Sequence, residues 1–594
     1  MQMCHACLRN EAEHRTEHVH HQTTSHLPQS KLRIIYLPTV GTTVQHHHTA
    51  KSSICHPPRP SINIHPNSHQ PSLLGLSQTH FDVLVIGGGP SGGSAAINCA
   101  ISGLSVLLVE AELAGGECGN WACIPSKALL RPLEIVAEGS HVGGAKELLV
   151  RTLQEQRGVN GQNGKGDAVV DLEGAWAFRD KCTNSWNDAS GVAAMESLGV
   201  KVARGFASFV GPRKVQVKGW LDDDVLVVTA DAVVLATGSE PVIPDIEGLK
   251  AAGYWTPREA VSAKVVPDHL IIIGAGLVGC EMATVYSQFG SNMSLIAKSD
   301  KILSKVVNEA SERVAKSLVQ KGVNIKTNAD VTSVRRDGKN VEIVLADGLV
   351  IAGSEILVAV GRRARTAGMA LGSIEGVEEG KPINVDESTR AVDVADGWLY
   401  AVGDINGSGW TTHMGMYHAT VAANNIIAKK KGLKPSDDLL FSTKFSMNAV
   451  PQVCFTDPAV AWVGMSLRQA EEKGIRAREI SVNTSGPGSH VYLQEEGYEG
   501  WAQWVLEIGT GKLLGATFVG RGTANLLHAS TVAIVGGMSC MQMLHAVPSF
   551  PTLSEAYWLL VQKSALTIRI RCLVARRWVN TAPLSHAVPI ACNC

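Results

Sequence analysis

Apolar runs of strand length recur along this chain, and two of them lead directly into glycine-rich turns. The first run covers residues 81–86 and the second covers 269–273. After each turn the residues favour a helix, and a further apolar strand follows at 106–109 and at 294–297. This order of strand, turn, helix and strand predicts two βαβ units, and therefore an α/β fold.

Both turns carry the G-x-G-x-x-G spacing of a dinucleotide-binding loop. The glycines of the first loop are Gly87, Gly89 and Gly92. Those of the second loop are Gly274, Gly276 and Gly279. The first glycine allows the tight turn, the second lets a pyrophosphate approach, and the third lets helix and strand pack closely. One such loop is weak support, but two in the same context favour two Rossmann-like domains over glycines that serve packing alone.

The two units differ where a ribose-binding acid is expected. Glu110 ends the second strand of the first unit, about twenty residues past its glycines, where a carboxylate holds a ribose hydroxyl. In the second unit Ala297 takes this place and Lys298 follows. A cation there accommodates a 2′-phosphate, so we expect NADPH rather than NADH. The alternative is that Lys298 and Lys301 are solvated surface charges.

Two cysteines, Cys118 and Cys123, lie five residues apart shortly after the first unit begins. In one regular helix their Cα atoms would be about 8–9 Å apart, whereas a disulfide needs roughly 4.4–6.8 Å. If they pair, Cys118 must lie on a distorted turn, which Gly119 and Asn120 tolerate. Pro125 suits a first helical turn, and the positive helix end would lower the pKa of Cys123. By spacing alone, two unrelated buried thiols are an equal alternative.

The chain resembles the pyridine nucleotide–disulfide oxidoreductases, which include dihydrolipoamide dehydrogenase, glutathione reductase and mercuric reductase. The likeness covers roughly residues 80–565. It rests on the two glycine loops, the cysteine segment and three further motifs. These motifs are Ala236–Ser239, Leu399–Asp404 and Val450–Pro458.

This resemblance implies FAD on the first loop and NADPH or NADH on the second, with a C-terminal α+β domain that forms a homodimer. It also implies a redox-active disulfide in which Cys123 is nearest the flavin and Cys118 exchanges with substrate. The remaining residues that it assigns to FAD are Thr237, Gly238 and Asp404. Lys127 matches the lysine near flavin N5, and Glu281 matches the glutamate that pairs with it.

The chain departs from this family at its C-terminal signature. Phe550 stands where the catalytic histidine is expected, while Glu555 is present. The resemblance implies that the dimer brings Glu555 near the partner's disulfide. Loss of a general base costs about 10²–10⁴ in rate, so disulfide substrates are disfavoured. His545 is out of register, and we interpret it as a structural or surface residue. Mercuric reductases lack the histidine too, but their C-terminal cysteines are adjacent, whereas Cys592 and Cys594 are spaced by one.

We therefore expect an enzyme that passes electrons from NAD(P)H through flavin and the Cys118–Cys123 pair to a small acceptor, such as a quinone or a metal ion. A dihydrolipoamide dehydrogenase with another group replacing the histidine is one alternative. A mercuric reductase-like metal reductase is a second, and a non-catalytic scaffold that binds FAD is a third.

Composition limits the other possibilities. A net charge of −1 argues against nucleic acid as a partner, and no apolar run is long enough to span a membrane. Thirteen cysteines in a chain of 594 residues do not indicate a secreted disulfide framework. No metal site is expected, and we interpret the pair Cys4 and Cys7 as incidental.

The expected boundaries follow the motifs. The FAD domain takes residues 80–255, with an insertion near 136–200, and 361–435; the NAD(P) domain takes 256–360 and the interface domain 441–563. Residues 1–79 are rich in histidine and, after Glu17, free of acids. We expect disorder there, as in a transit peptide to chloroplast or mitochondrion; a misassigned exon is the alternative, and without a transit peptide the location is cytoplasmic. The basic tail 566–594 is of doubtful origin.

Overall fold

The computed structural model describes residues 78–151, 168–219, 224–434, 439–444, 449–485 and 498–565. The histidine-rich leader with Cys4 and Cys7, residues 152–167 of the expected insertion, and the tail with Cys592 and Cys594 lie outside the described residues.

A six-stranded sheet carries the first glycine loop. Its strands are β1 (His80–Ile86), β2 (Val106–Glu110), β3 (Val200–Gly211), β4 (Lys214–Gly219), β5 (Val225–Leu235) and β15 (Leu399–Ala401). Strands β3, β2, β1, β5 and β15 lie parallel in that order, and β4 pairs antiparallel with both β3 and β5. β1 and β2 are apolar along almost their whole length, as expected for parallel strands covered on both faces.

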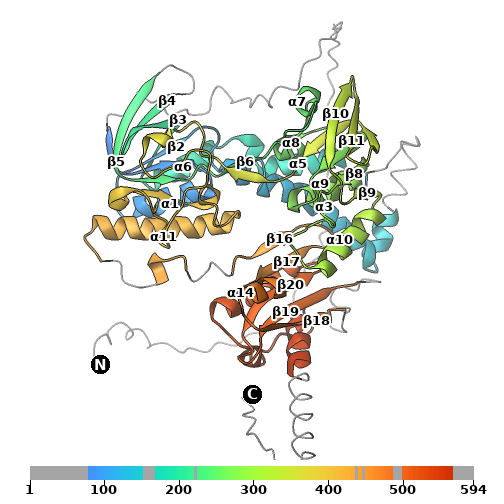
Figure 1. Ribbon diagram of the computed structural model, residues 1–594. Helices are drawn as coiled ribbons and strands as arrows, with labels where there is room; N and C mark the ends of the chain where they lie inside the picture. The colour runs from blue at the N-terminus through green and yellow to red at the C-terminus, as the bar shows by residue number, and fades with distance from the viewer. Residues whose placement is uncertain are drawn as a thin grey trace, which may run out of the picture. The chain divides into compact units, whose positions relative to one another are not determined.

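Helices cover this sheet and bring in the distant end of the chain. α1 (Pro90–Ile101) packs beside α11 (Thr412–Lys430), as Figure 1 shows. Their small residues, Ala95, Ala96 and Ala419 among them, share one buried cluster with the strands. Because α11 follows β15, the segment after the second unit returns to the first sheet.

The second unit is a four-stranded parallel sheet in the order β13-β7-β8-β9. Its strands are β7 (His269–Ile273), β8 (Asn292–Ile296), β9 (Val323–Lys326) and β13 (Glu355–Val358), with helices α9 (Leu277–Gln288) and α10 (Asn308–Gln320). An antiparallel sheet shares an apolar cluster with it. The strands of that sheet are β10 (Val331–Asp337), β11 (Asn340–Leu345) and β12 (Val350–Gly353).

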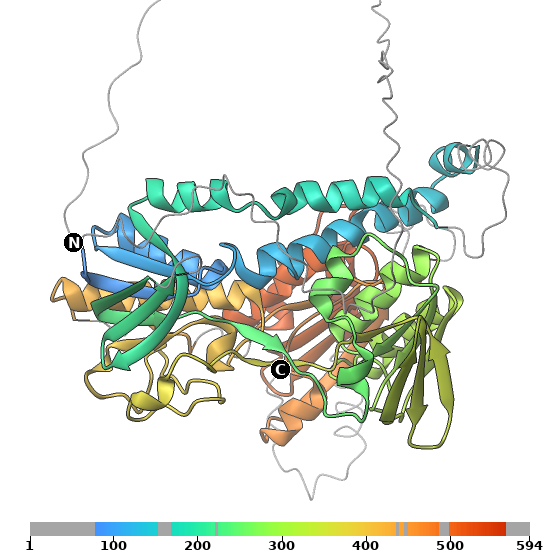
Figure 2. The same ribbon diagram turned by 90° about the horizontal axis from the view of Figure 1, so that it is seen from above.

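The described part of residues 136–200 is helical and contributes to the core. α3 (Cys123–His141) lies alongside α5 (Leu172–Cys182), as Figure 2 shows, and α6 (Ala189–Ser197) follows. Arg179 of α5 is fully buried and donates hydrogen bonds to the carbonyls of Val261 and Ala263 at 3.1 and 2.8 Å. This segment therefore ties the first unit to the start of the second.

The C-terminal unit is an antiparallel sheet in the order β16-β17-β20-β19-β18, with helices packed on it. Its strands are β16 (Gln452–Cys454), β17 (Val460–Gly464), β18 (Ala477–Asn483), β19 (Trp501–Glu507) and β20 (Leu513–Val519). Its helices are α12 (Leu467–Glu472), α14 (Thr523–Val535), α15 (Cys540–Met543) and one over 555–565. Two parallel-sheet units and this α+β unit confirm the predicted fold class.

Short elements complete the described chain. They are α2 (Gly116–Asn120), β6 (Ser239–Pro241), α7 (Leu249–Ala252), α8 (Pro257–Ser262), β14 (Arg362–Ala364) and the 3-10 helices η2 (Asn184–Trp186), η3 (Leu371–Ser373), η4 (Ala395–Gly397), η5 (Gly403–Asn406) and η6 (Leu439–Phe441). β6 and β14 pair antiparallel. Among the described residues, none of the helices combines the length and apolar character needed to cross a membrane.

Candidate active site

Cys118 and Cys123 lie on two different helices, so they do not belong to one regular helix. Cys118 is in the short helix α2, and Cys123 is the first residue of α3. The chain breaks between them at Ala122, with φ −135° and ψ −95°. Gly119 and Asn120, which the sequence suggested for the distortion, are instead regular residues of α2. The break therefore lies just after the expected position.

Both cysteines are free thiols that meet at one hydroxyl group. Thr412, the first residue of α11, donates to Cys118 Sγ at 3.0 Å, and its Oγ1 lies 3.5 Å from Cys123 Sγ. The hydrogen bond from Cys118 lowers the pKa of Cys123, and Thr412 and the charge on Lys127 lower it further, against the effect of burial. The same hydrogen bond, together with burial, raises the pKa of Cys118. One thiolate, centred on Cys123, is thus favoured.

An ion pair between a partly exposed lysine and a buried glutamate lies one helical turn from the second cysteine. Lys127 Nζ is 2.7 Å from Glu281 Oε2, and Glu281 Oε1 accepts a hydrogen bond from the Phe455 amide at 3.0 Å. Lys127 also stands over the Phe455 ring, 4.9 Å from its centroid. Burial opposes the charge on Lys127, but Glu281 outweighs it and the pKa of Lys127 is raised. A fixed positive charge therefore faces Cys123.

Backbone atoms pack tightly around the first and third glycines of the first loop. Gly87 has φ +104°, and a Cβ there would lie 2.5 Å from the Ala236 carbonyl oxygen. A Cβ on Gly92 would lie 1.8 Å from the carbonyl oxygen of Gly87. Gly89 begins α1 and lies against Gly116 of the cysteine helix. The loop thus tolerates no side chain where helix and strand meet, and it contacts the cysteine segment directly.

Glu110 is buried at the end of β2 and bonds to backbone amides. Its carboxylate accepts hydrogen bonds from Gly88 at 2.5 Å and from Glu112 at 2.6 Å. Burial raises the pKa of Glu110, although both amides oppose that shift. The carboxylate is therefore held rigidly beside the loop, where a ribose would lie.

A second set of polar groups converges from distant parts of the first unit. Asp404, in η5, accepts a hydrogen bond from Ser239 Oγ at 2.5 Å, and burial raises the pKa of Asp404. Thr237 donates to the Arg365 carbonyl at 2.6 Å, and Gly238 has φ +70°. Their convergence with the first loop fits the flavin nucleotide that the resemblance implied.

The second loop has the same backbone conformation as the first, but no acidic residue follows the next strand. Gly274 has φ +109°, and a Cβ on Gly279 would lie 1.9 Å from the Gly274 carbonyl oxygen. A Cβ on Gly276, at the start of α9, would meet no atom within 4 Å. This open position fits a pyrophosphate. Ala297 is buried after β8, and Lys298 is 83% exposed and 2.9 Å from Asp330.

The C-terminal residues of the predicted site lie on the antiparallel unit. Glu555 begins the last described helix and is half-buried. Phe550 is 75% exposed, and His545 is exposed as well.

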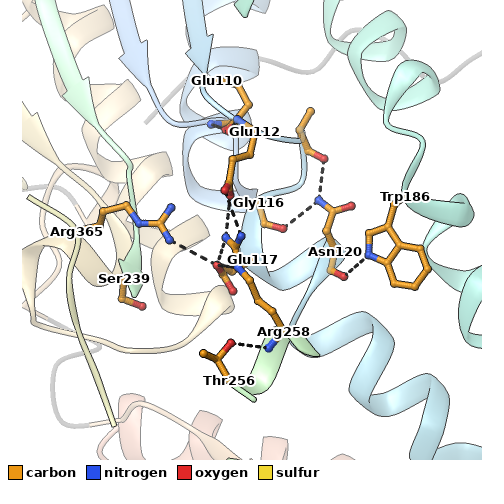
Figure 3. A network of polar contacts seen from close by, with 12 residues as sticks. Glu110, Glu112, Gly116, Glu117, Asn120, Trp186, Ser239, Thr256, Arg258 and Arg365 are labelled. Atoms are coloured by element: carbon orange, nitrogen blue, oxygen red, sulfur yellow. Dashed lines mark hydrogen bonds and ion pairs between the residues drawn. The ribbon is translucent and has the colours of Figure 1, made fainter. Parts of the chain in front are cut away.

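Sequence reasoning missed Thr412 and a charged network around Glu117. Thr412 is 289 residues from Cys123, so no spacing could have indicated the contact. Glu117 lies between the guanidinium groups of Arg258, Arg362 and Arg365, as Figure 3 shows in part. Glu117 stands inside the cysteine motif, but its partners come from two later segments, α8 and the stretch around β14.

Comparison with known proteins agrees with this arrangement. A family model described as pyridine nucleotide-disulphide oxidoreductase matches residues 81–425, and the model of its dimerisation domain matches 450–561. The dihydrolipoyl dehydrogenase of Thermus scotoductus is 31% identical over 485 residues, which are 80% of this chain and 95% of that protein. The mercuric reductase of Staphylococcus aureus is 28% identical over 480 residues, 80% of this chain and 81% of that protein.

Solved structures show the same fold. The flavoprotein disulfide reductase RclA from Escherichia coli, in a Cu(II) complex, has a TM-score of 0.67 at 21% identity, covering 82% of this chain and 99% of that chain. LpdA from Mycobacterium tuberculosis has a TM-score of 0.66 at 22% identity, with the same two coverages. The chain therefore belongs to the pyridine nucleotide-disulphide oxidoreductase family, as an FAD- and NAD(P)H-dependent enzyme with a dimerisation domain.

Proposed function

We propose that Cys118 and Cys123 form the redox-active pair of this enzyme, and that they deliver electrons from NAD(P)H and FAD to a small acceptor such as a quinone or a metal ion. The meeting of both sulfurs at Thr412 Oγ1, at 3.0 and 3.5 Å, carries this proposal. Two thiols that share a hydrogen bond and face a lysine are arranged for thiolate chemistry rather than for packing.

The first unit supplies groups suited to FAD. The loop from Gly87 to Gly92 and the start of α1 would hold the pyrophosphate, Glu110 the ribose and Asp404 the ribityl chain, beside Thr237 and Gly238. When bound, FAD supplies the chemistry that carries two electrons from a hydride donor to a disulfide. Gly89 lies against Gly116, two residues before Cys118, so a group on this loop would adjoin the cysteine segment.

The side chains around the two sulfurs favour a thiolate on Cys123 and a protonated thiol on Cys118. Lys127 keeps its charge because Glu281 holds it at 2.7 Å, and this charge favours a thiolate on Cys123. Cys118 keeps its proton because its pKa is raised, and it donates to Cys123. We assign Cys118 to exchange with the acceptor, as the resemblance implies, because the thiolate favoured on Cys123 is the one that Lys127 faces.

Phe550 decides the class of acceptor. A phenyl ring cannot transfer the proton that a thiol leaving group requires, whereas a histidine titrates near neutral pH. A quinone or a metal ion accepts electrons without that leaving group. Glu555 would lie near the cysteines of the partner subunit in the homodimer. We favour NADPH as the donor, since Ala297 leaves no acid after β8.

An acceptor panel tests this function. Purified enzyme with NADPH should reduce quinones or Hg²⁺ and should turn over lipoamide and glutathione disulfide slowly. The variant Phe550→His should raise disulfide reduction by about 10²–10⁴-fold and leave quinone reduction unchanged. Rapid reduction of a disulfide by the unmodified enzyme, with little effect of Phe550→His, would instead support a dihydrolipoamide dehydrogenase.

A further inference from the structure

One arginine contacts the residues on both sides of the first cysteine. Arg258, on α8, donates from Nε to Glu117 at 2.7 Å, and Glu117 directly precedes Cys118. Its guanidinium carbon also lies 4.2 Å from the ring centroid of Trp121, which ends α2. A single planar group therefore contacts residues near both ends of the short helix that carries Cys118. Figure 3 shows its contact with Glu117.

The same guanidinium is fixed from its other edge by a second carboxylate. Arg258 donates to Glu112 at 3.1 Å from one terminal nitrogen and at 2.7 Å from the other. These contacts raise the pKa of Arg258 against the opposing effect of burial, so it stays charged. Because guanidinium is a rigid fork, it can bridge two carboxylates while it stacks on an indole.

Other contacts support α2 independently of Arg258. Asn120 Nδ2 donates to the carbonyls of Ala114 and Gly116 at 3.2 and 3.0 Å, and Trp186 Nε1 donates to the Asn120 carbonyl at 2.9 Å. Glu117 also lies 3.8 Å from Arg362 and 3.5 Å from Arg365. Loss of Arg258 should therefore loosen α2 without unfolding it.

We propose that Arg258 is a positioning residue that fixes Cys118 against Cys123, an inference that rests on the proposed role of this pair. The chain breaks at Ala122, so α2 and α3 could otherwise turn relative to each other. A disulfide forms only within a narrow range of Cα separations. By holding Glu117 and Trp121, Arg258 restricts that turning and raises the effective concentration of one sulfur at the other.

A thiol–disulfide titration of the full-length holoenzyme tests this role. The two thiols lose two protons and two electrons to oxidised dithiothreitol, which becomes the dithiol. After alkylation, mass spectrometry measures the oxidised fraction of the peptide that holds both cysteines. Arg258→Met should shift the equilibrium about tenfold towards the dithiol, which corresponds to about 30 mV for a two-electron couple.

Arg336→Met is the matched control. Arg336 is as buried as Arg258, at 23% against 22% exposed, and it also binds a carboxylate, Glu355, at 2.6 Å, but it lies on β10. The variant Arg336→Met should leave the equilibrium between dithiol and disulfide unchanged. Arg258→Lys keeps the charge but cannot bridge and stack, so it should behave like Arg258→Met. Glu117→Gln, which keeps Arg258 in place, should give a smaller shift in the same direction.

The outcomes separate the two proposals. An unmodified protein that forms no Cys118–Cys123 disulfide at any dithiothreitol ratio would refute the proposed function. A normal transition in the unmodified protein, with Arg258→Met matching Arg336→Met, would refute the role of Arg258 alone. Full rescue by Arg258→Lys would show that charge, not position, is what matters, and would also overturn the inference.

Discussion

The two nucleotide units have the same glycine loop but carry different side chains at the end of the following strand. Gly87 donates to the Val109 carbonyl at 2.8 Å, and Gly274 donates to the Ile296 carbonyl at 2.9 Å. The next residues, Glu110 and Ala297, therefore occupy equivalent positions. The first is a buried carboxylate bonded to its own loop, and the second is a buried methyl group followed by an exposed lysine.

This difference suits the two nucleotides that the family binds. A buried carboxylate that is already bonded to backbone amides is preorganised, which favours a cofactor that stays bound. An exposed cation on a flexible side chain binds weakly and releases easily, as a coenzyme that exchanges in every cycle requires. The first loop also contacts the cysteine helix at Gly116, so we expect the tightly held nucleotide to lie beside Cys118 and Cys123.

The largest effect should come from filling the first loop. In Gly92→Ala the new methyl group would lie 1.8 Å from the Gly87 carbonyl oxygen, so the helix and strand must separate. Overpacking of this kind costs about 1–3 kcal/mol or more, and we expect protein purified without FAD. The ratio of FAD to protein, from visible absorbance, measures this.

Gly276→Ala is the control in the second unit. Its methyl group meets no atom within 4 Å, so FAD content and folding should be unchanged, while the KM for NADPH rises because the pyrophosphate loses its close approach. Full FAD occupancy in Gly92→Ala would contradict the claim that the first loop has no room for a side chain at this position.

A second comparison sets the thiol of the first unit against a thiol of the second. The pKa of Cys123 is lowered, so its thiolate persists as pH falls below the ordinary thiol range and is lost only below the lowered pKa. Burial raises the pKa of Cys280, on α9 of the second unit, so this thiol stays protonated and unreactive.

Alkylation of the reduced protein with iodoacetamide, followed by mass spectrometry, should show this contrast. The rate at Cys123 should stay high well below about pH 8.5, the ordinary thiol midpoint. Lys127→Met should move its midpoint upward, because a favourable charge is lost. Labelling of Cys280 at a similar rate would contradict the contrast.

Giving the second unit the acid of the first should reverse its coenzyme preference. Ala297→Glu places a carboxylate at the position equivalent to Glu110, where it can bind the ribose hydroxyls of NADH and repel a 2′-phosphate. Like charges in contact cost several kcal/mol, so kcat/KM for NADPH relative to NADH should fall at least about tenfold. Ala297→Gln, of equal size and without charge, should have a much smaller effect.

The sequence predicted the features that depend on neighbours along the chain. Glycine spacing, apolar strands and the place of Ala297 are local patterns, because a loop and its flanking strands impose their own steric limits. The break between the cysteines fell at Ala122 rather than at Gly119 and Asn120, next to Trp121, whose ring contacts Arg258 of α8, and this long-range contact has no signal in the local sequence.

Long-range contacts could not be predicted in this way. Thr412 reaches both sulfurs from the helix that follows β15, and Arg258 reaches Glu117 from α8. Threonine and arginine are common residues, and nothing in their spacing distinguishes these two from others. The ion pair of Lys127 and Glu281 was found only because the family motif marks both residues.

The smallest predicted effect concerns Lys298 itself. Its ammonium group is 83% exposed and already lies 2.9 Å from Asp330, which is 54% exposed. Exposed ion pairs contribute about 0.2–1 kcal/mol, so Lys298→Met should lower the NADPH:NADH ratio of kcat/KM only about two- to fivefold.

Salt and a neighbouring lysine give the controls for this last effect. The effect should fade at high salt, because exposed charges are screened. Lys301→Met should not change the ratio, because Lys301 is engaged by the Val306 carbonyl at 2.8 Å and by Asn308 at 2.6 Å. An equal effect of the two variants would mean that general positive charge, rather than the position after β8, selects the coenzyme. The choice of coenzyme would then depend on Ala297, which leaves this strand end without the acid that the first unit has at Glu110, and not on the position of Lys298.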